Sequence, residues 1–139
     1  AIGPIPTFYK RLKAGQNCFC SDTSRDFLDM SDFLSFMDLA IKEEAPTGAF
    51  NLASGEAHSI KEIFDLVTDY LGLGAKEVPV VPPAADDVPV VSLDASETFR
   101  VFAWKAQVGF AETIRRQLAW YDEHGVTDVF SHLKTPSVK

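Results

Sequence analysis

The feature that most constrains the fold is a strong helix signal near the middle of the chain. Ser59-Ile60-Lys61-Glu62 has the spacing of a capping box, in which a serine hydroxyl and a glutamate carboxylate bind free backbone N–H groups at the start of a helix. Apolar residues then recur at spacings of three and four, at Ile60, Ile63, Phe64, Val67, Tyr70 and Leu71. Gly72 ends the pattern. The chain therefore has to build a core against an amphipathic helix over residues 60–71.

Weaker patterns complete the predicted element order. Further helices are expected over residues 5–15, 31–43, 96–102 and 110–125, from their apolar spacing and from the caps, glycines and prolines that border them. Short strands are expected at 17–20, 25–30, 47–53, 78–81 and 88–93. A chain of 139 residues is long enough to bury a core without disulfides or a metal. The fold class predicted is α+β, with one domain over residues 1–134 and a flexible tail over 135–139.

Composition excludes several function classes. Thirteen basic and twenty acidic residues give a net charge of −7, which disfavours a nucleic-acid-binding surface. The apolar runs are too short to span a membrane, and the first residues do not resemble a signal peptide. Cys18 and Cys20 are expected to be reduced, apolar residues, because a metal site would need more ligands. We expect a cytoplasmic protein without a metal.

Motifs for catalysis and cofactor binding are scarce. The sequence contains no dinucleotide-binding G-x-G-x-x-G, no P-loop and no G-x-S-x-G nucleophile turn. The three histidines have no metal-ligand spacing. Tyr9 and Lys13 match Y-x-x-x-K, the catalytic pair of short-chain dehydrogenases. The pattern is also common on lysine-rich surface helices, and the nearby Pro6 favours that interpretation.

A series of short motifs in a fixed order carries a family resemblance. They are Gly3-Pro4-Ile5-Pro6, Arg25-Asp26-Phe27 through Asp32, Phe50-Asn51 through Gly55, Ser59 through Glu62, Asp87-Val88-Pro89, Ala103-Trp104-Lys105 and Trp120-Tyr121. In this order and spacing the chain resembles the C-terminal half of the NAD-dependent epimerase/dehydratase family, the extended short-chain dehydrogenases that act on nucleotide sugars. Within that family it is most similar to bacterial enzymes of surface-polysaccharide biosynthesis.

The resemblance implies that substrate binding, and not cofactor binding or catalysis, belongs to this chain. The dinucleotide fingerprint and catalytic Tyr-Lys pair of the family belong to its N-terminal, Rossmann half, so no catalytic or cofactor-binding residue is assigned to this chain, although the parent family uses NAD. The chain would be the part that binds a nucleotide-diphosphate sugar, and it would not be catalytic alone. Its protein partner would be the Rossmann half or a second copy. The alternative is a free-standing, non-enzymatic module that binds a nucleotide sugar or another protein.

The resemblance also implies residues for the diphosphate. Pro4, Ile5 and Thr7 lie at the start of a helix, whose N–H groups and dipole favour an anion. Arg25 would donate to phosphate oxygens through its planar guanidinium. The alternative for Arg25 is a surface ion pair with Asp26. In the register where the family often has a second arginine, this chain has Ala84.

A second group of residues would hold the nucleoside. The backbone of Asn17 and Cys18 would bind a nucleobase edge, and Phe19 would stack on the base or pack beside it. Asp87 matches the family residue that accepts a hydrogen bond from a ribose hydroxyl.

Other residues of the motifs have structural explanations. Asp32 is expected to cap a helix, Asn51 to hold a turn through side-chain bonds, and Trp104 and Tyr121 to lie in the core. His58 is expected to be a solvated neighbour of the capping box.

Overall fold

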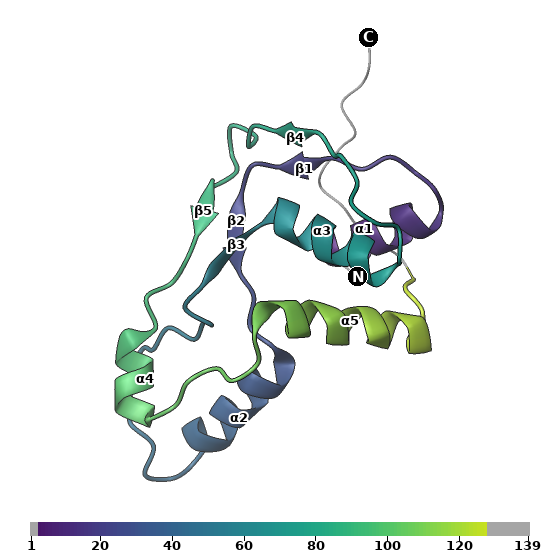
Figure 1. Ribbon diagram of the computed structural model, residues 1–139. Helices are drawn as coiled ribbons and strands as arrows, with labels where there is room; N and C mark the ends of the chain where they lie inside the picture. Colours follow the sequence, from purple (N-terminus) through teal and green to yellow (C-terminus); the bar gives the residue numbers. More distant parts are fainter. Residues whose placement is uncertain (1–2, 128–139) are drawn as a thin grey trace.

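The computed structural model describes residues 3–127, and its elements alternate between helices and very short strands (Figure 1). In chain order they are α1 (Pro4–Lys13), β1 (Cys20–Ser21), β2 (Ser24–Asp26), α2 (Met30–Ala40), β3 (Ala57–Ser59), α3 (Ile60–Tyr70), β4 (Val80–Val81), β5 (Val90–Val91), α4 (Ser96–Phe102) and α5 (Phe110–His124). This arrangement agrees with the predicted mixture of helices and short strands.

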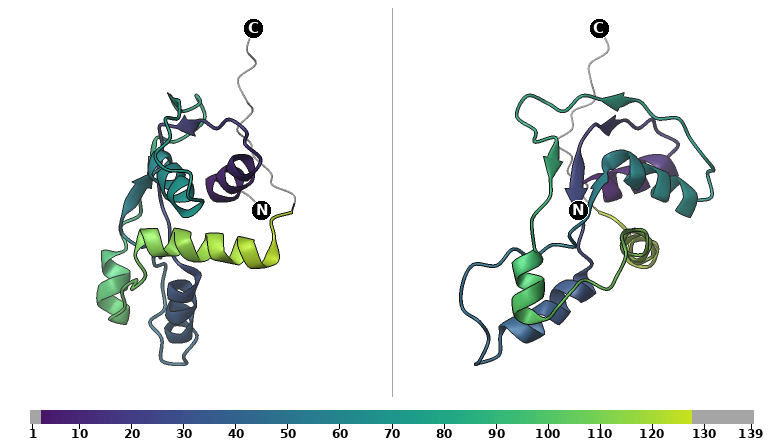
Figure 2. Two further views of the ribbon diagram at one scale, coloured as in Figure 1. Left: turned by 45° about the vertical axis from the view of Figure 1, so that its right-hand side comes forward. Right: turned by 60° about the vertical axis from the view of Figure 1, so that its left-hand side comes forward.

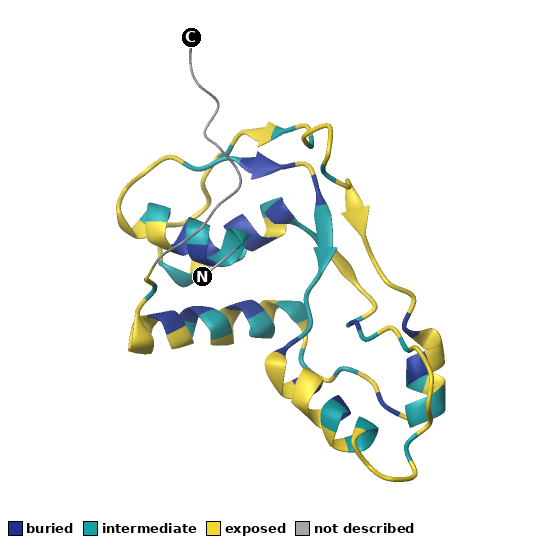
Figure 3. Ribbon diagram, turned by 180° about the vertical axis from the view of Figure 1, so that it is seen from behind, coloured by how far each residue is buried: buried dark blue, intermediate teal, exposed yellow. Residues whose placement is uncertain are grey.

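The helix predicted from the capping box is the centre of the fold. The Ser59 N–H donates to Glu62 Oε2 at 2.7 Å, and the Glu62 N–H donates to Ser59 Oγ at 3.1 Å, which confirms the box. Ile63 and Val67 on α3 are fully buried. They belong to one core cluster with residues of α1 and α5, and the three helices lie together in both further views (Figure 2). Figure 3 shows buried residues along these helices and exposed residues on their outer sides.

Two small sheets lie beside this helical core. β1 pairs with β4 in parallel, and β2 is the middle strand of a second sheet in the order β3-β2-β5. β2 runs antiparallel to β3 and parallel to β5, so Arg25 lies opposite His58 on one side and Val91 on the other. Because β1 and β2 are separated by only two residues, the chain passes directly from one sheet to the other.

Helices α2 and α4 lie near each other and away from the three-helix core (Figure 1), and a second group of aromatic residues packs around them. Phe36 contacts Phe102 and Trp104 with ring centroids 4.9 and 5.3 Å apart. Trp104 is buried and donates from Nε1 to Ser35 Oγ at 2.8 Å, so its predicted core position is confirmed. Ala103 ends α4 with φ 47°, the left-handed conformation that favours glycine.

Asp32 does not cap α2, contrary to the prediction. Asp29 is the cap, since its carboxylate accepts from the Ser31 N–H at 2.8 Å. Asp32 is buried in the first turn and accepts from the backbone N–H groups of Gln107 and Val108 at 3.0 and 2.9 Å. It therefore joins α2 to the segment before α5, a long-range contact that no local pattern indicates.

Three other expectations are corrected by the structure. Residues 47–53 form no ladder, and the third strand is Ala57–Ser59, which runs directly into α3. His58 is not a solvated residue: its ring stacks on Phe110 at 3.8 Å, and Nδ1 lies 3.3 Å from Glu62 Oε1. Asn51 holds no local turn, because its amide donates to the distant Asp94 carbonyl at 3.0 Å.

The predicted core position of Tyr121 is confirmed. Both cysteines are free thiols, and burial raises the pKa of Cys20 to about 11. Within the described part of the chain, no helix has the length and apolarity needed to cross a membrane. The same residues contain no cluster of His, Cys, Asp and Glu that could hold a metal ion.

Candidate functional site

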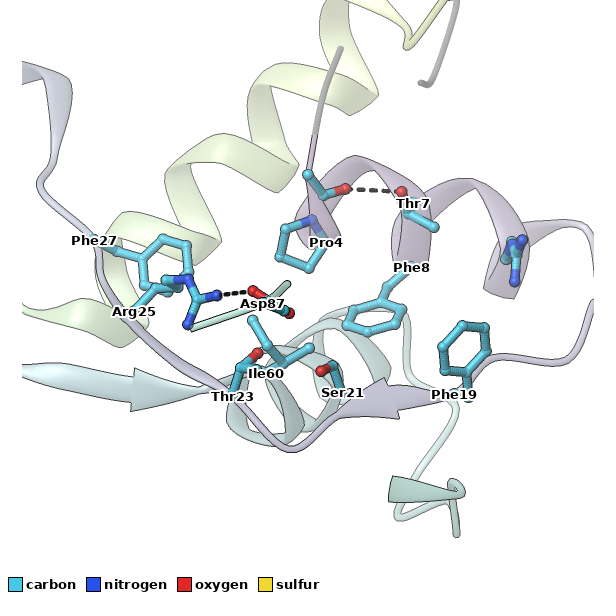
Figure 4. Close-up of a pocket in the computed structure, with 12 residues that line it drawn as sticks. Pro4, Thr7, Phe8, Phe19, Ser21, Thr23, Arg25, Phe27, Ile60 and Asp87 are labelled. Carbon is cyan, nitrogen blue, oxygen red and sulfur yellow. Dashed lines mark hydrogen bonds and ion pairs between the residues drawn. The ribbon is translucent and has the colours of Figure 1, made fainter. Parts of the chain in front are cut away.

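A cavity of about 180 Å³ lies between α1 and the turn that joins the two sheets (Figure 4). Its walls come from α1, from the chain between Phe19 and Phe27, from the start of α3 and from the loop after β4. The lining residues are Gly3, Pro4, Thr7, Phe8, Arg11, Phe19, Ser21, Thr23, Arg25, Phe27, Ile60 and Asp87.

One side of α1 forms a wall of the cavity. Pro4, Thr7, Phe8 and Arg11 recur at spacings of three and four, so they lie along a single face of the helix. Pro4 and Pro6 have no backbone N–H, so Ile5 is the one residue among the first three of α1 that keeps a donor. The start of α1 consequently offers an anion its dipole and few N–H groups, fewer than the sequence-based expectation of a helix N-terminus implies.

Arg25 and Asp87 form an ion pair at one end of the cavity. Arg25 Nη2 lies 2.6 Å from Asp87 Oδ1, and Nη1 donates to the carbonyl of Ser24 at 2.8 Å. Figure 4 shows this pair beside Pro4, at the start of α1. Asp26, the alternative partner considered for Arg25, instead accepts from the Ser54 N–H at 2.9 Å. The structure thus brings the predicted arginine, the predicted aspartate and the opening of α1 to one place.

The middle of the cavity combines apolar surface with two buried hydroxyl residues. Phe8 and Ile60 contribute the apolar atoms. As whole residues Ser21 and Thr23 are only 6% and 5% exposed, but their hydroxyl oxygens are not fully buried, and within residues 3–127 neither forms a hydrogen bond. The two hydroxyls therefore open onto the cavity, where they can exchange hydrogen bonds with a polar ligand.

Four of the seven predicted site residues line the cavity: Pro4, Phe19, Arg25 and Asp87. Ile5, Asn17 and Cys18 are not among the lining residues, and this part of the predicted site is not supported by the cavity. Ile5 and Cys18 pack against the core, and Asn17 is exposed. The hydrogen-bonded strand begins at Cys20 rather than at residue 17, and the binding of a nucleotide by these three residues stays a prediction.

Sequence reasoning missed several lining residues. Phe8 and Arg11 could have been found, because they share the spacing of Pro4 and Thr7 on one helix face. Ser21 and Thr23 carry no such signal. They line the cavity because the chain turns between two sheets there, which depends on contacts with β4 and β5 far along the sequence.

Tyr9 and Lys13 lie apart from this cavity, in a network that joins three helices. The Tyr9 hydroxyl donates to Asp122 Oδ1 at 2.5 Å, the Tyr70 hydroxyl donates to Asp122 Oδ2 at 2.7 Å, and Lys13 Nζ lies 3.0 Å from the Tyr9 oxygen. Tyr9 is buried rather than on the surface, and burial raises its pKa. A proton-transferring phenol needs the opposite shift, so the geometry supports a structural role for this pair.

The chain is similar in sequence and in structure to several known proteins. No family model matches it. It is 32% identical over 97 residues to GDP-mannose 4,6 dehydratase 2 of Arabidopsis thaliana, covering 66% of this chain and 25% of that protein. Among solved structures, the enzyme WbmG of Bordetella bronchiseptica in complex with NAD superposes with a TM-score of 0.87 at 68% identity, over 96% of this chain. The chain belongs to the NAD-dependent epimerase/dehydratase family.

Members of the epimerase/dehydratase family with lower identity share the same fold. UDP-glucose 4-epimerase of Thermotoga maritima, solved with UDP-glucose, matches 87% of this chain with a TM-score of 0.75 and 22% identity. The chain matches only part of the length of each of these relatives. The chain spans 43% of the length of WbmG and a quarter of the length of the dehydratase.

Proposed function

We propose that this chain is the nucleotide-sugar-binding portion of an NAD-dependent epimerase or dehydratase of bacterial surface-polysaccharide biosynthesis, acting in the cytoplasm. The observation that carries the proposal is the convergence of Arg25, Asp87 and the start of α1 on one cavity. WbmG, solved in complex with NAD and UDP, is 67% identical over 96% of this chain. The cavity is the region of the present chain best suited to the UDP portion of such a ligand.

The chemistry of the cavity matches a nucleoside diphosphate. The Arg25 guanidinium has the planar fork that binds two phosphate oxygens, and the α1 dipole adds positive potential at the same end. The aromatic ring of Phe19, at the opposite end, offers a surface for a base. The unpartnered hydroxyls of Ser21 and Thr23 lie between these ends and can bind the polar groups of a sugar.

NAD, the cofactor that the relatives hold, does not fit the residues described here. Dinucleotides bind where a parallel strand passes through a glycine-rich turn into a helix. In residues 3–127, β3 is the one strand that leads directly into a helix, and it does so through Ser59 with no glycine turn. We therefore assign no hydride-transfer step to this chain, and its role is to bind and orient the substrate.

A protein-interaction role is the second candidate, and one surface favours it. Large apolar residues are exposed on α2 and directly after it: Met30 and Leu34 on the helix are 67% and 55% exposed, and Ile41 at its C-cap is 73% exposed. Such a patch is typical of a surface that another polypeptide covers. A Rossmann half or a second copy of the chain would serve as that partner.

Calorimetric titration with UDP, UDP-glucose and dTDP-glucose tests the nucleotide-binding proposal. Wild-type chain should bind at least one of them, and Arg25→Ala should weaken binding by about 1.5–3 kcal/mol, the range for a hydrogen bond to a charged group. Arg100→Ala is the control, because Arg100 is exposed on α4 and does not line the cavity. Failure of all three ligands to bind at millimolar concentration would leave only the interaction role.

A further inference from the structure

The cavity contains a second guanidinium, and its charge has no partner in the described structure. Arg11 lines the cavity together with Phe19. Within residues 3–127 its side chain forms no ion pair and no hydrogen bond, whereas Arg25 is paired with Asp87. Position 84, where the family often has a second arginine, is an alanine in this chain. The two arginines that line the cavity are Arg11 and Arg25.

Arg11 and Arg25 serve different parts of a ligand. Arg11 is seven residues beyond Pro4 on α1, which places it about 10 Å farther along the helix axis. Figure 4 shows Arg25 and Asp87 near Pro4, and Phe19 beyond Phe8 toward the other end of α1. Since the helix dipole favours an anion at the start of α1 and disfavours one at its end, the phosphates belong beside Arg25. The end with Arg11 and Phe19 suits a neutral, flat group with hydrogen-bond acceptors.

The Arg11 side chain lies close to the chain that precedes β1, because Arg11 and Phe19 line the same cavity. Burial raises the pKa of the Cys18 thiol, and the positive charge of Arg11 partly opposes that increase. The guanidinium is therefore near the segment that carries Phe19 into the cavity. A base stacked on Phe19 would present its edge to a side chain that can only donate hydrogen bonds.

Resting on the proposed function, we propose that Arg11 reads the keto edge of the nucleobase and selects uracil-type bases over cytosine. Uracil has a carbonyl acceptor at C4, where cytosine has an amino donor. The five N–H groups of arginine can bind the carbonyl, but they face another donor in cytosine. Uracil and cytosine have nearly the same size and outline, so the discrimination between them has to come from this polar contact.

Titration with UDP and CDP tests the assignment, because the two ligands differ only in the base edge. Wild-type chain should bind UDP about tenfold more tightly than CDP, the effect of one charge-assisted hydrogen bond. Arg11→Met keeps most of the apolar stem and should weaken UDP about tenfold while leaving CDP almost unchanged. Lys10→Met removes the same charge from an exposed neighbour outside the cavity and should leave both affinities within about twofold.

The outcomes separate this inference from the proposed function. Equal binding of UDP and CDP by wild type, or equal weakening of both by Arg11→Met, would overturn the role of Arg11 and leave the nucleotide site standing. Failure of both ligands to bind wild type would overturn the proposed function. Circular dichroism checks that Arg11→Met is folded. If it is not, Arg11→Lys provides the test, since it keeps the charge and loses the fork, and should reduce the UDP preference at least threefold.

Discussion

Neutralising Asp87 should strengthen the binding of inorganic pyrophosphate to this chain. In the present structure the Asp87 carboxylate lies 2.6 Å from the Arg25 guanidinium, and the side chains are 26% and 28% exposed. A diphosphate that uses Arg25 has to replace this carboxylate or accept its repulsion. Asp87→Asn keeps the shape of the side chain and removes both effects, so the pyrophosphate affinity should rise.

The size of the gain follows from the exposure of the pair. Two unit charges about 4 Å apart interact by about 4 kcal/mol at the effective dielectric constant of a protein surface. Solvent reaches this pair, and measured exposed pairs retain about 1 kcal/mol or less. The partly buried position of Asp87 puts the expected gain at about 1–2 kcal/mol, or a five- to thirtyfold tighter pyrophosphate complex. UDP should gain less, because Asp87→Asn also weakens an acceptor for the ribose.

Isothermal titration of wild type, Asp87→Asn and Asp86→Asn with pyrophosphate measures this effect. Asp86 is exposed, adjacent and absent from the cavity lining, so its variant controls for the change in net charge. Equal gains in both variants would assign the effect to net charge alone. A loss of pyrophosphate affinity in Asp87→Asn would refute the reasoning, because it would mean that Asp87 mainly holds Arg25 in position.

Two further predictions concern stability. Asp32→Ala should lower the free energy of unfolding by about 2–4 kcal/mol in urea titrations, because the buried carboxylate accepts two backbone hydrogen bonds. The control is Asp38→Ala, an exposed position on the same helix, which should lower it by less than about 0.5 kcal/mol. Equal effects of the two substitutions would contradict the importance of the Asp32 contact. Hydrogen bonds from Tyr70, Tyr9 and Lys13 lower the pKa of Asp122 to about 2, so its contribution is complete above pH 4 and is lost as the pH falls toward 2. Asp122→Asn should show a smaller loss of stability over that interval in acid unfolding, and an unchanged acid profile would contradict the assignment.

Local patterns predicted the elements whose stability is local. The capping box and the apolar spacing of α3 could be recognised because Ser59 and Glu62 interact within one helical turn. Residues 47–53 were predicted as a strand and form none, since a strand exists only if a partner is available to pair with it. Asp32 shows the same limit: its partners, Gln107 and Val108, follow it by more than 70 residues, so nothing near it in the sequence indicates them.

The candidate site was predictable to the extent that family motifs carry long-range information. Arg25 and Asp87 are 62 residues apart, and only the resemblance suggested that they serve one ligand. Their meeting in one cavity agrees with that suggestion, while their binding of a nucleotide stays a prediction. Arg11 has no family motif to mark it, although its position on the same helix face as Pro4 was available from the spacing.

The walls of the cavity come from α1, from the turn between β1 and β2, and from the loop after β4, segments that only the native fold brings together. Occupancy of the cavity and folding of the chain are consequently coupled equilibria. A compound that binds the native state alone adds about 2.7 kcal/mol to its stability at one hundred times its dissociation constant. The melting temperature of this chain can thus rank candidate ligands before any turnover has been observed.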